Sequence, residues 1–137
     1  LSRYQAGMHY GWHSDEPFID AVRTDVSFTL FLSEPASYEG GALEVRSASG
    51  VESFKLDAGS VVLYASGDLH RVEPVTAGTR LAAVGWMQSR IRSSEQRALQ
   101  FDLAATLAGL GPEVADARAE LAAIRHKLLR MWSDSSA

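Results

Sequence analysis

The chain has 137 residues, of which 46% are hydrophobic and 22% charged, so it fits one folded domain and is neither disordered nor of low complexity. Asp and Glu total 17 against 13 Lys and Arg, and the net charge of −4 offers no basic excess for binding nucleic acid. There is no cysteine, which excludes disulfides, thiolate zinc sites and cysteine nucleophiles.

The region up to residue 92 predicts a series of short strands separated by turns. Val26–Leu32 is apolar, aromatic and β-branched, which is typical of a buried strand, and Ser33–Gly41 after it is rich in turn-forming residues. The later predicted strands are Ala42–Arg46, Val51–Leu56, Ser60–Ala65, Leu69–Val75 and Thr79–Met87, the last two joined as a hairpin by a turn at Thr76–Gly78. This spacing predicts a mainly β fold, an antiparallel barrel or jelly roll.

Helical periodicity begins after the predicted strands. Ser93 or Ser94 is a candidate N-cap for a helix that ends near Leu110, and Pro112 is placed to start a second helix. Apolar residues recur at helical spacing in the second helix, at Val114, Leu121, Ile124, Leu128 and Met131. We therefore expect a β-barrel at residues 1–92 and a helical hairpin at residues 93–137, which either covers the barrel or serves dimerisation.

No apolar stretch of the sequence is long enough to span a membrane, since the most apolar run, Ser60–Ala65, has only the length of a strand. No export signal is visible, which predicts a cytoplasmic protein. The chain begins at Leu1 inside a strand-like stretch, and we expect it to be an N-terminally truncated fragment of a longer protein.

Two histidines and an aspartate are candidate metal ligands. In His13-Ser14-Asp15 the imidazole and the carboxylate lie two positions apart, so on an extended chain they point to the same side. His70 follows a hydrophobic strand through a short turn. Two imidazoles and one carboxylate on a β scaffold form the facial triad of non-haem Fe(II) oxygenases, which leaves metal positions open for substrates.

Arg80 is a candidate binding residue for an anion. On its predicted strand it shares a face with Ala82, Val84 and Trp86, so that face is apolar apart from one guanidinium. An arginine on an inward face requires an anionic partner, and a bound carboxylate would supply one. The alternative is an arginine that extends outward to solvent at the end of the strand.

The order His13-x-Asp15, His70 and Arg80 is similar to that of the Fe(II)/2-oxoglutarate-dependent dioxygenases. The segments RTDVSFTLFLSEPASYEGGALEV and VVLYASGDLHRVEPVTAGTRLAAVGWMQS resemble the PKHD-type hydroxylases, relatives of prolyl and lysyl hydroxylases. The resemblance implies a double-stranded β-helix in which His13, Asp15 and His70 bind Fe(II). It also implies that Arg80 binds the distal carboxylate of 2-oxoglutarate, with Tyr4 near this cosubstrate.

The resemblance predicts an enzyme that uses O2 and 2-oxoglutarate to hydroxylate a substrate, with release of succinate and CO2. The substrate class stays open between a peptidyl prolyl or lysyl side chain and a small molecule such as a siderophore. L-ascorbate is a further candidate cofactor, and a homodimer is a candidate assembly. The alternatives are a cupin-like metal- or ligand-binding barrel without oxygenase activity, and a degenerate barrel that acts only in protein interactions.

Aromatic residues flank the candidate site. Tyr10 and Trp12 either line a substrate pocket or pack in the core, whereas Trp86 is predicted to be a core residue. His9 precedes the metal motif in the wrong phase and His126 lies between basic residues of a predicted helix, so neither is expected to bind metal.

Overall fold

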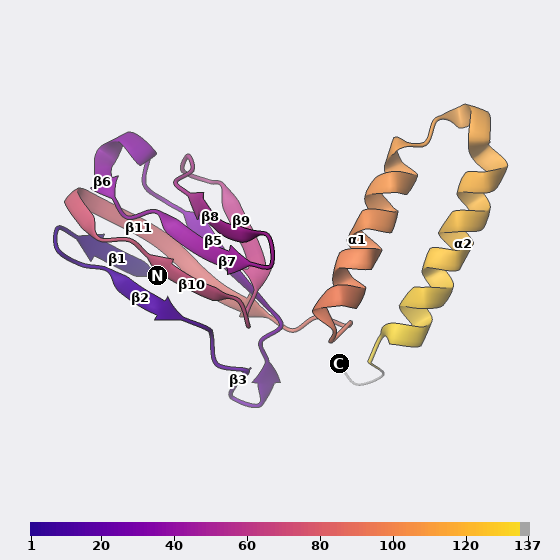
Figure 1. The fold of residues 1–137 in the computed structure, drawn as a ribbon, viewed down its shortest axis with the longest axis horizontal. Helices are drawn as coiled ribbons and strands as arrows, with labels where there is room; N and C mark the ends of the chain where they lie inside the picture. The colour runs from indigo at the N-terminus through magenta and orange to yellow at the C-terminus, as the bar shows by residue number, and fades with distance from the viewer. Residues whose placement is uncertain (135–137) are drawn as a thin grey trace. The chain divides into compact units, whose positions relative to one another are not determined.

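The computed structural model in Figure 1 describes residues 1–134, and the last three residues of the predicted helical extension, 135–137, lie outside the described residues. The chain forms two compact units, of which the first is Leu1–Gln88 and the second begins at Ser89. The sequence places this boundary slightly later, after residue 92. No helix among the described residues is long and apolar enough to cross a membrane.

The first unit consists of antiparallel strands in two main sheets and a separate two-stranded hairpin, β3–β4. The larger sheet has the order β1-β11-β5-β9, with β6 also paired to β11, and the smaller sheet has the order β2-β10-β7-β8. Strand bounds are β1 Ser2–Gln5, β2 Tyr10–His13, β3 Phe18–Ile19, β4 Val22–Arg23, β5 Val26–Phe31, β6 Tyr38–Gly40, β7 Leu43–Ser47, β8 Gly50–Phe54, β9 Val61–Ala65, β10 Leu69–Val72 and β11 Val75–Met87. The predicted mainly β, jelly-roll fold is confirmed, although the two sheets do not close into a continuous barrel.

The core lies between the inner faces of the two sheets. Burial alternates along β5, where Ser27, Thr29 and Phe31 are buried and the residues between them are partly exposed. Phe31 packs in one cluster with Leu43 and three further apolar side chains, Val45, Val62 and Phe54. Because strand side chains alternate in direction, the same face of β5 carries a large apolar residue at one end and hydroxyl groups at the other.

The predicted hairpin between Leu69–Val75 and Thr79–Met87 is wrong. β10 ends at Val72 and pairs with β2 and β7, whereas β11 begins at Val75 and pairs with strands of the other sheet. The chain crosses between the sheets at Glu73 and Pro74, and proline has no amide hydrogen to continue a ladder. Gly78, with φ +75°, pairs with Tyr38 of β6, just after a register shift between Val75 and Ala77, instead of closing a turn.

The predicted loop Ser33–Gly41 is only partly irregular. It contains a 3₁₀ turn at Pro35–Ser37 and the strand β6. Gly40 and Gly41 both adopt positive φ values, +68° and +66°, as the chain turns from β6 toward β7. A side chain at either position would be strained, which explains the glycine pair.

The second unit is a pair of antiparallel helices, α1 Ser94–Gly109 and α2 Ala115–Trp132 (Figure 1). Ser93 is the N-cap of α1, since its hydroxyl accepts a hydrogen bond from the amide of Gln96. A 3₁₀ turn at Pro112–Val114 precedes α2, so the second helix begins later than predicted. Within α2, all of which the structure describes, no residue is fully buried, and what covers its apolar positions stays a prediction.

Phe31 offers a test of the core. Replacing Phe31, which is 1% exposed, with alanine should lower the free energy of unfolding by about 3–5 kcal/mol, because it removes apolar contacts and leaves a cavity. The matched control is Phe18→Ala, since Phe18 is 57% exposed in the β3–β4 hairpin and should cost about 1 kcal/mol or less. Chemical denaturation measures both, and equal losses would contradict the described core.

Candidate active site

Two histidines lie side by side on neighbouring strands of the smaller sheet. The antiparallel pairing of β2 with β10 sets His70 directly opposite His13, and the centroids of the two rings are 4.2 Å apart. Each ring donates its Nδ1 hydrogen to a backbone carbonyl two residues earlier in the chain, His13 to Gly11 at 2.8 Å and His70 to Asp68 at 2.9 Å. A carbonyl can only accept, so in the neutral rings both Nε2 atoms carry free lone pairs.

Asp15 joins the two imidazoles from just beyond the end of β2. Its Oδ1 lies 3.9 Å from Nε2 of His13 and 3.7 Å from Nε2 of His70, which is too long for a hydrogen bond. One possible ligand atom from each residue lies within 4.8 Å of the others. Three possible ligand atoms that converge without a hydrogen bond between them fit a bound cation, and this donor set suits Fe(II).

The second oxygen of Asp15 is held by the larger sheet. Its Oδ2 accepts a hydrogen bond of 2.5 Å from the hydroxyl of Ser27 on β5, and Ser27 Oγ lies 2.8 Å from the hydroxyl of Ser66. The backbone amide of Asp15 also donates to the carbonyl of Ser66 at 3.0 Å. Ser27 and Ser66 are 1% and 2% exposed, so the carboxylate is fixed by buried groups.

Aromatic rings support the imidazoles on both sides. The Tyr10 ring lies 3.9 Å from the His13 ring, and the Tyr64 ring lies 4.8 Å from the His70 ring. Burial raises the pKa of the Tyr64 phenol above its usual value, so this hydroxyl remains protonated near neutral pH. The row of four rings limits the rotation of the two histidines.

Arg80 lies inside the fold and does not extend to solvent. It is 1% exposed on β11, directly opposite Tyr4 of β1, and its guanidinium carbon lies 5.4 Å from the Tyr4 ring and 5.5 Å from the Phe31 ring. Burial lowers the pKa of the guanidinium below its usual value. Its Nε and one terminal nitrogen have no hydrogen-bond partner among the described residues. Unpaired donors on a buried cation fit a carboxylate ligand.

The aliphatic part of the Arg80 side chain packs against Gly41, which has no side chain. A Cβ atom added to Gly41 would lie 3.2 Å from Cδ of Arg80, 3.3 Å from the Tyr38 ring and 2.8 Å from a methyl group of Val75. Tyr38 is buried beside Arg80, and Nζ of Lys55 lies 4.5 Å from the centroid of its ring. The bare α-carbon of Gly41 therefore provides the space that the arginine occupies.

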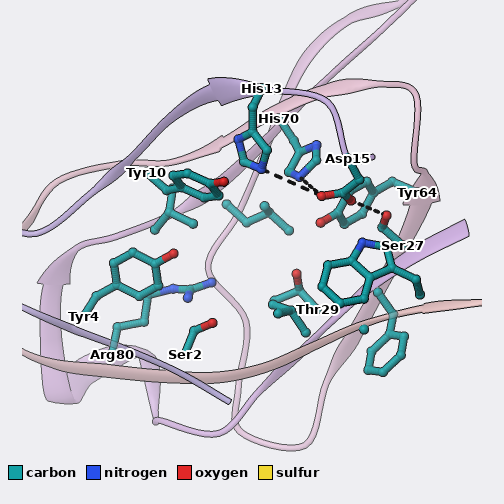
Figure 2. A pocket seen from close by; sticks show the side chains of 16 residues that line it. Ser2, Tyr4, Tyr10, His13, Asp15, Ser27, Thr29, Tyr64, His70 and Arg80 are labelled. Atoms are coloured by element: carbon teal, nitrogen blue, oxygen red, sulfur yellow. Dashed lines mark hydrogen bonds and ion pairs between the residues drawn. The ribbon is translucent and has the colours of Figure 1, made fainter. Parts of the chain in front are cut away.

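Figure 2 shows the two groups of residues at opposite ends of one cleft, with His13, His70 and Asp15 at one end and Tyr4 and Arg80 at the other. The cleft has a volume of about 210 Å³. Its other lining residues come from both sheets and include Ser2, Tyr10, Ser27, Thr29, Leu43, Tyr64, Val72, Val84 and Trp86.

The prediction that Trp86 is a core residue is wrong. It is 43% exposed and lines the cleft together with Val84, on the same face of β11 as Arg80. Tyr10 lines the cleft as well. Trp12 is not among the residues that line the cleft, and the guanidinium carbons of Arg46 and Arg71 lie 4.6 and 4.9 Å from its ring.

The sequence interpretation missed the serine pair and the buried tyrosines. Its one usable signal was the alternation in Val26–Phe31, where Ser27 and Thr29 share a face with Phe31 in an otherwise apolar strand. Polar residues at every second position of a buried strand indicate a polar cavity on that side. No comparable signal marks Ser66 or Tyr38, since their neighbours become known only from the fold.

The comparisons with known proteins agree with this geometry. A family described as the 2OG-Fe(II) oxygenase superfamily matches residues 1–88. A PKHD-type hydroxylase of Parvibaculum lavamentivorans is 53% identical over 137 residues, covering 98% of this chain and 62% of that protein. A PKHD-type hydroxylase of Acaryochloris marina is 57% identical over 103 residues, covering 75% of this chain and 47% of that protein. The chain spans roughly half to three fifths of the length of these relatives.

Among solved structures, the chain is similar to a prolyl-4-hydroxylase of Pseudomonas putida. The TM-score is 0.54 and the identity is 33%, and the match covers 65% of this chain and 50% of that one. The predicted resemblance to PKHD-type hydroxylases is confirmed by these comparisons.

Proposed function

Because this chain belongs to the 2OG-Fe(II) oxygenase superfamily, we propose that it is the catalytic part of an Fe(II)- and 2-oxoglutarate-dependent hydroxylase. The observation that carries the proposal is the combination, in one cleft, of a His-His-Asp donor set with a buried arginine whose donors are unpaired. A cupin-like barrel that binds only a metal would account for the three donor residues. It would not account for the buried arginine, which requires an anionic partner.

His13, Asp15 and His70 would hold the metal. The carbonyls of Gly11 and Asp68 keep both Nδ1 atoms protonated, so that each Nε2 is available as a ligand. When bound, Fe(II) and 2-oxoglutarate supply the activation of O2 and the oxidative decarboxylation that releases succinate and CO2. The protein residues orient the ligands, and the Tyr10 and Tyr64 rings pack against the two histidines.

Arg80 would pair with the distal carboxylate of 2-oxoglutarate at the far end of the cleft, with Tyr4 beside it. A guanidinium presents parallel donors that match a carboxylate, and burial strengthens the pair because water competes poorly there. Arg80 touches cosubstrate in this proposal but not the metal, so the two binding functions are separable by mutation.

The substrate that is hydroxylated stays open between a peptidyl side chain and a small molecule. The relatives are named hydroxylases, and the similar solved structure is described as a prolyl-4-hydroxylase. Tyr10 and Trp86, which are 53% and 43% exposed, would face this substrate at the mouth of the cleft. A role for L-ascorbate, a homodimer and a cytoplasmic location stay predictions.

The metal site is tested with His70→Ala. Titrated without oxygen and in the presence of 2-oxoglutarate, the parent chain should bind Fe(II) and release succinate once oxygen is admitted. His70→Ala should do neither, because it removes one of three protein ligands. His9→Ala is the matched control, since His9 is exposed and outside the donor set, and it should behave as the parent. Iron binding without succinate would favour the cupin-like alternative.

Arg80→Leu tests the carboxylate anchor. The affinity for 2-oxoglutarate should fall by about 10- to 1000-fold, since a charge-assisted hydrogen bond contributes about 1.5–3 kcal/mol and a desolvated pair more. Arg80→Lys should recover only part of this loss, because an ammonium lacks the paired donors. Calorimetric titration of the metal-loaded chain measures all three proteins. An unchanged affinity in Arg80→Leu would overturn the assignment, while metal affinity should stay near that of the parent.

Gly41→Ala tests the space that Arg80 needs. The added methyl group would meet Val75 and Arg80, so it should displace the guanidinium and weaken 2-oxoglutarate binding. Gly59→Ala is the control: Gly59 also has a positive φ, +90°, but nothing lies within 4 Å of the added atom. Both variants should lose about 1–2 kcal/mol of stability from the backbone conformation. Equal 2-oxoglutarate affinities in the two variants would contradict the packing role of Gly41.

A further inference from the structure

We propose that Ser27 is a positioning residue for the metal site, whose buried hydroxyl holds Asp15 so that only one carboxylate oxygen faces the two histidines. The inference rests on the metal site proposed above. It concerns a residue of the larger sheet that binds neither metal nor cosubstrate in that proposal. Ser27 acts through Asp15, so its effect should appear first in metal binding.

The two oxygens of Asp15 have different surroundings. Oδ1 faces Nε2 of His13 and of His70, whereas Oδ2 accepts the hydrogen bond of 2.5 Å from Ser27. A hydroxyl that donates to a carboxylate forms a short and strong hydrogen bond, and 2.5 Å is at the short end of the range. With Oδ2 engaged in this way, the carboxylate presents Oδ1 to the cation position.

No other side chain in the part of the chain that the structure describes donates a hydrogen bond to the Asp15 carboxylate. Asp15 follows the end of β2 and lies outside any strand, so sheet pairing does not fix its side chain. Its backbone is tied to Ser66 through the amide hydrogen bond. Ser27 is therefore the group that decides the rotation of the carboxylate about its last bond.

The position of Ser27 is itself well determined. β5 lies inside the larger sheet, and Ser27 pairs with Tyr64 of β9 on one side and Trp86 of β11 on the other. Ser66 Oγ lies 2.8 Å from the Ser27 hydroxyl, which can accept a hydrogen bond from Ser66 while it donates its own hydrogen to Asp15. A strand paired along both edges cannot shift by one residue without turning its inner face outward. The Ser27 hydroxyl is thus a fixed hydrogen-bond donor for the Asp15 carboxylate.

A purely structural role makes a different prediction. If the two serine hydroxyls served only as hydrogen-bond partners for each other, Ser27→Ala and Ser66→Ala would lower the stability of the fold similarly. Both variants would then leave the metal site unchanged. If Ser27 positions Asp15, only Ser27→Ala should alter the metal site strongly, because Ser66 does not touch the carboxylate. Ser66→Ala is therefore a matched control in the same hydrogen-bonded pair.

The experiment titrates Co²⁺ into the full 137-residue chain without 2-oxoglutarate, with calorimetry for affinity and the visible absorption of Co²⁺ for coordination. Ser27→Ala should weaken Co²⁺ binding by about 10- to 100-fold, the usual effect of removing a group that orients a ligand, and should change the spectrum. Ser27→Thr keeps the hydroxyl and suits a strand, so it should bind within about threefold of the parent with the parent spectrum. Ser66→Ala should also bind Co²⁺ within about threefold of the parent and keep the parent spectrum.

Thermal unfolding of the metal-free variants separates folding from binding. A folded Ser27→Ala with parent affinity and spectrum would overturn the role of Ser27 and leave the metal site standing. A parent chain that binds no Co²⁺ would overturn the metal site and this role together. If Ser27→Ala does not fold, Ser27→Val replaces it, since valine has the shape of threonine without the hydroxyl. Equal affinities in Ser27→Val and Ser27→Thr would then overturn the proposal.

Discussion

The candidate site depends on one register, the antiparallel pairing of β2 with β10 that sets His70 opposite His13. Side chains alternate along a strand, so a slip of one residue would turn one imidazole to the outer face and separate the pair. Asp15 is not covered by this constraint because it follows the strand. Its attachment to Ser66 and Ser27 brings it back toward the histidines, and the donor set therefore requires both sheets.

The buried guanidinium of Arg80 is a cost to the free chain. Nε and a terminal nitrogen have no partner among the described residues, and an unpaired buried charge is destabilising. The rings of Tyr4 and Phe31 offset part of that cost, since cations are attracted to aromatic faces. A ligand carboxylate would offset more of it, and its binding would stabilise the fold.

Local patterns in the sequence were enough to predict the candidate ligands and the face that carries Arg80, because a strand fixes the direction of neighbouring side chains. Pairing between distant strands was not predictable in the same way. The residues Thr76–Gly78 are good turn formers, yet β11 continues through them because β6 is available as a partner. The location of Trp86 was also not predictable from its hydrophobicity, because an apolar side chain can pack in a core or line a cleft. The contacts of Ser66 with Ser27 and of Tyr38 with Arg80 join residues far apart in the sequence, so they were identified only from the fold.

The strand β5 links the two ends of the cleft. Its inner face carries Ser27 against Asp15, Thr29 in the lining and Phe31 against the Arg80 guanidinium. Ser27 and Phe31 are separated by four residue steps, about 13 Å along an extended strand. Since β5 is paired with both β9 and β11, this separation cannot change without breaking the sheet. In the proposed site, one rigid strand therefore sets the distance between the metal and the anchor for the distal carboxylate, and so the length of cosubstrate that can bridge them.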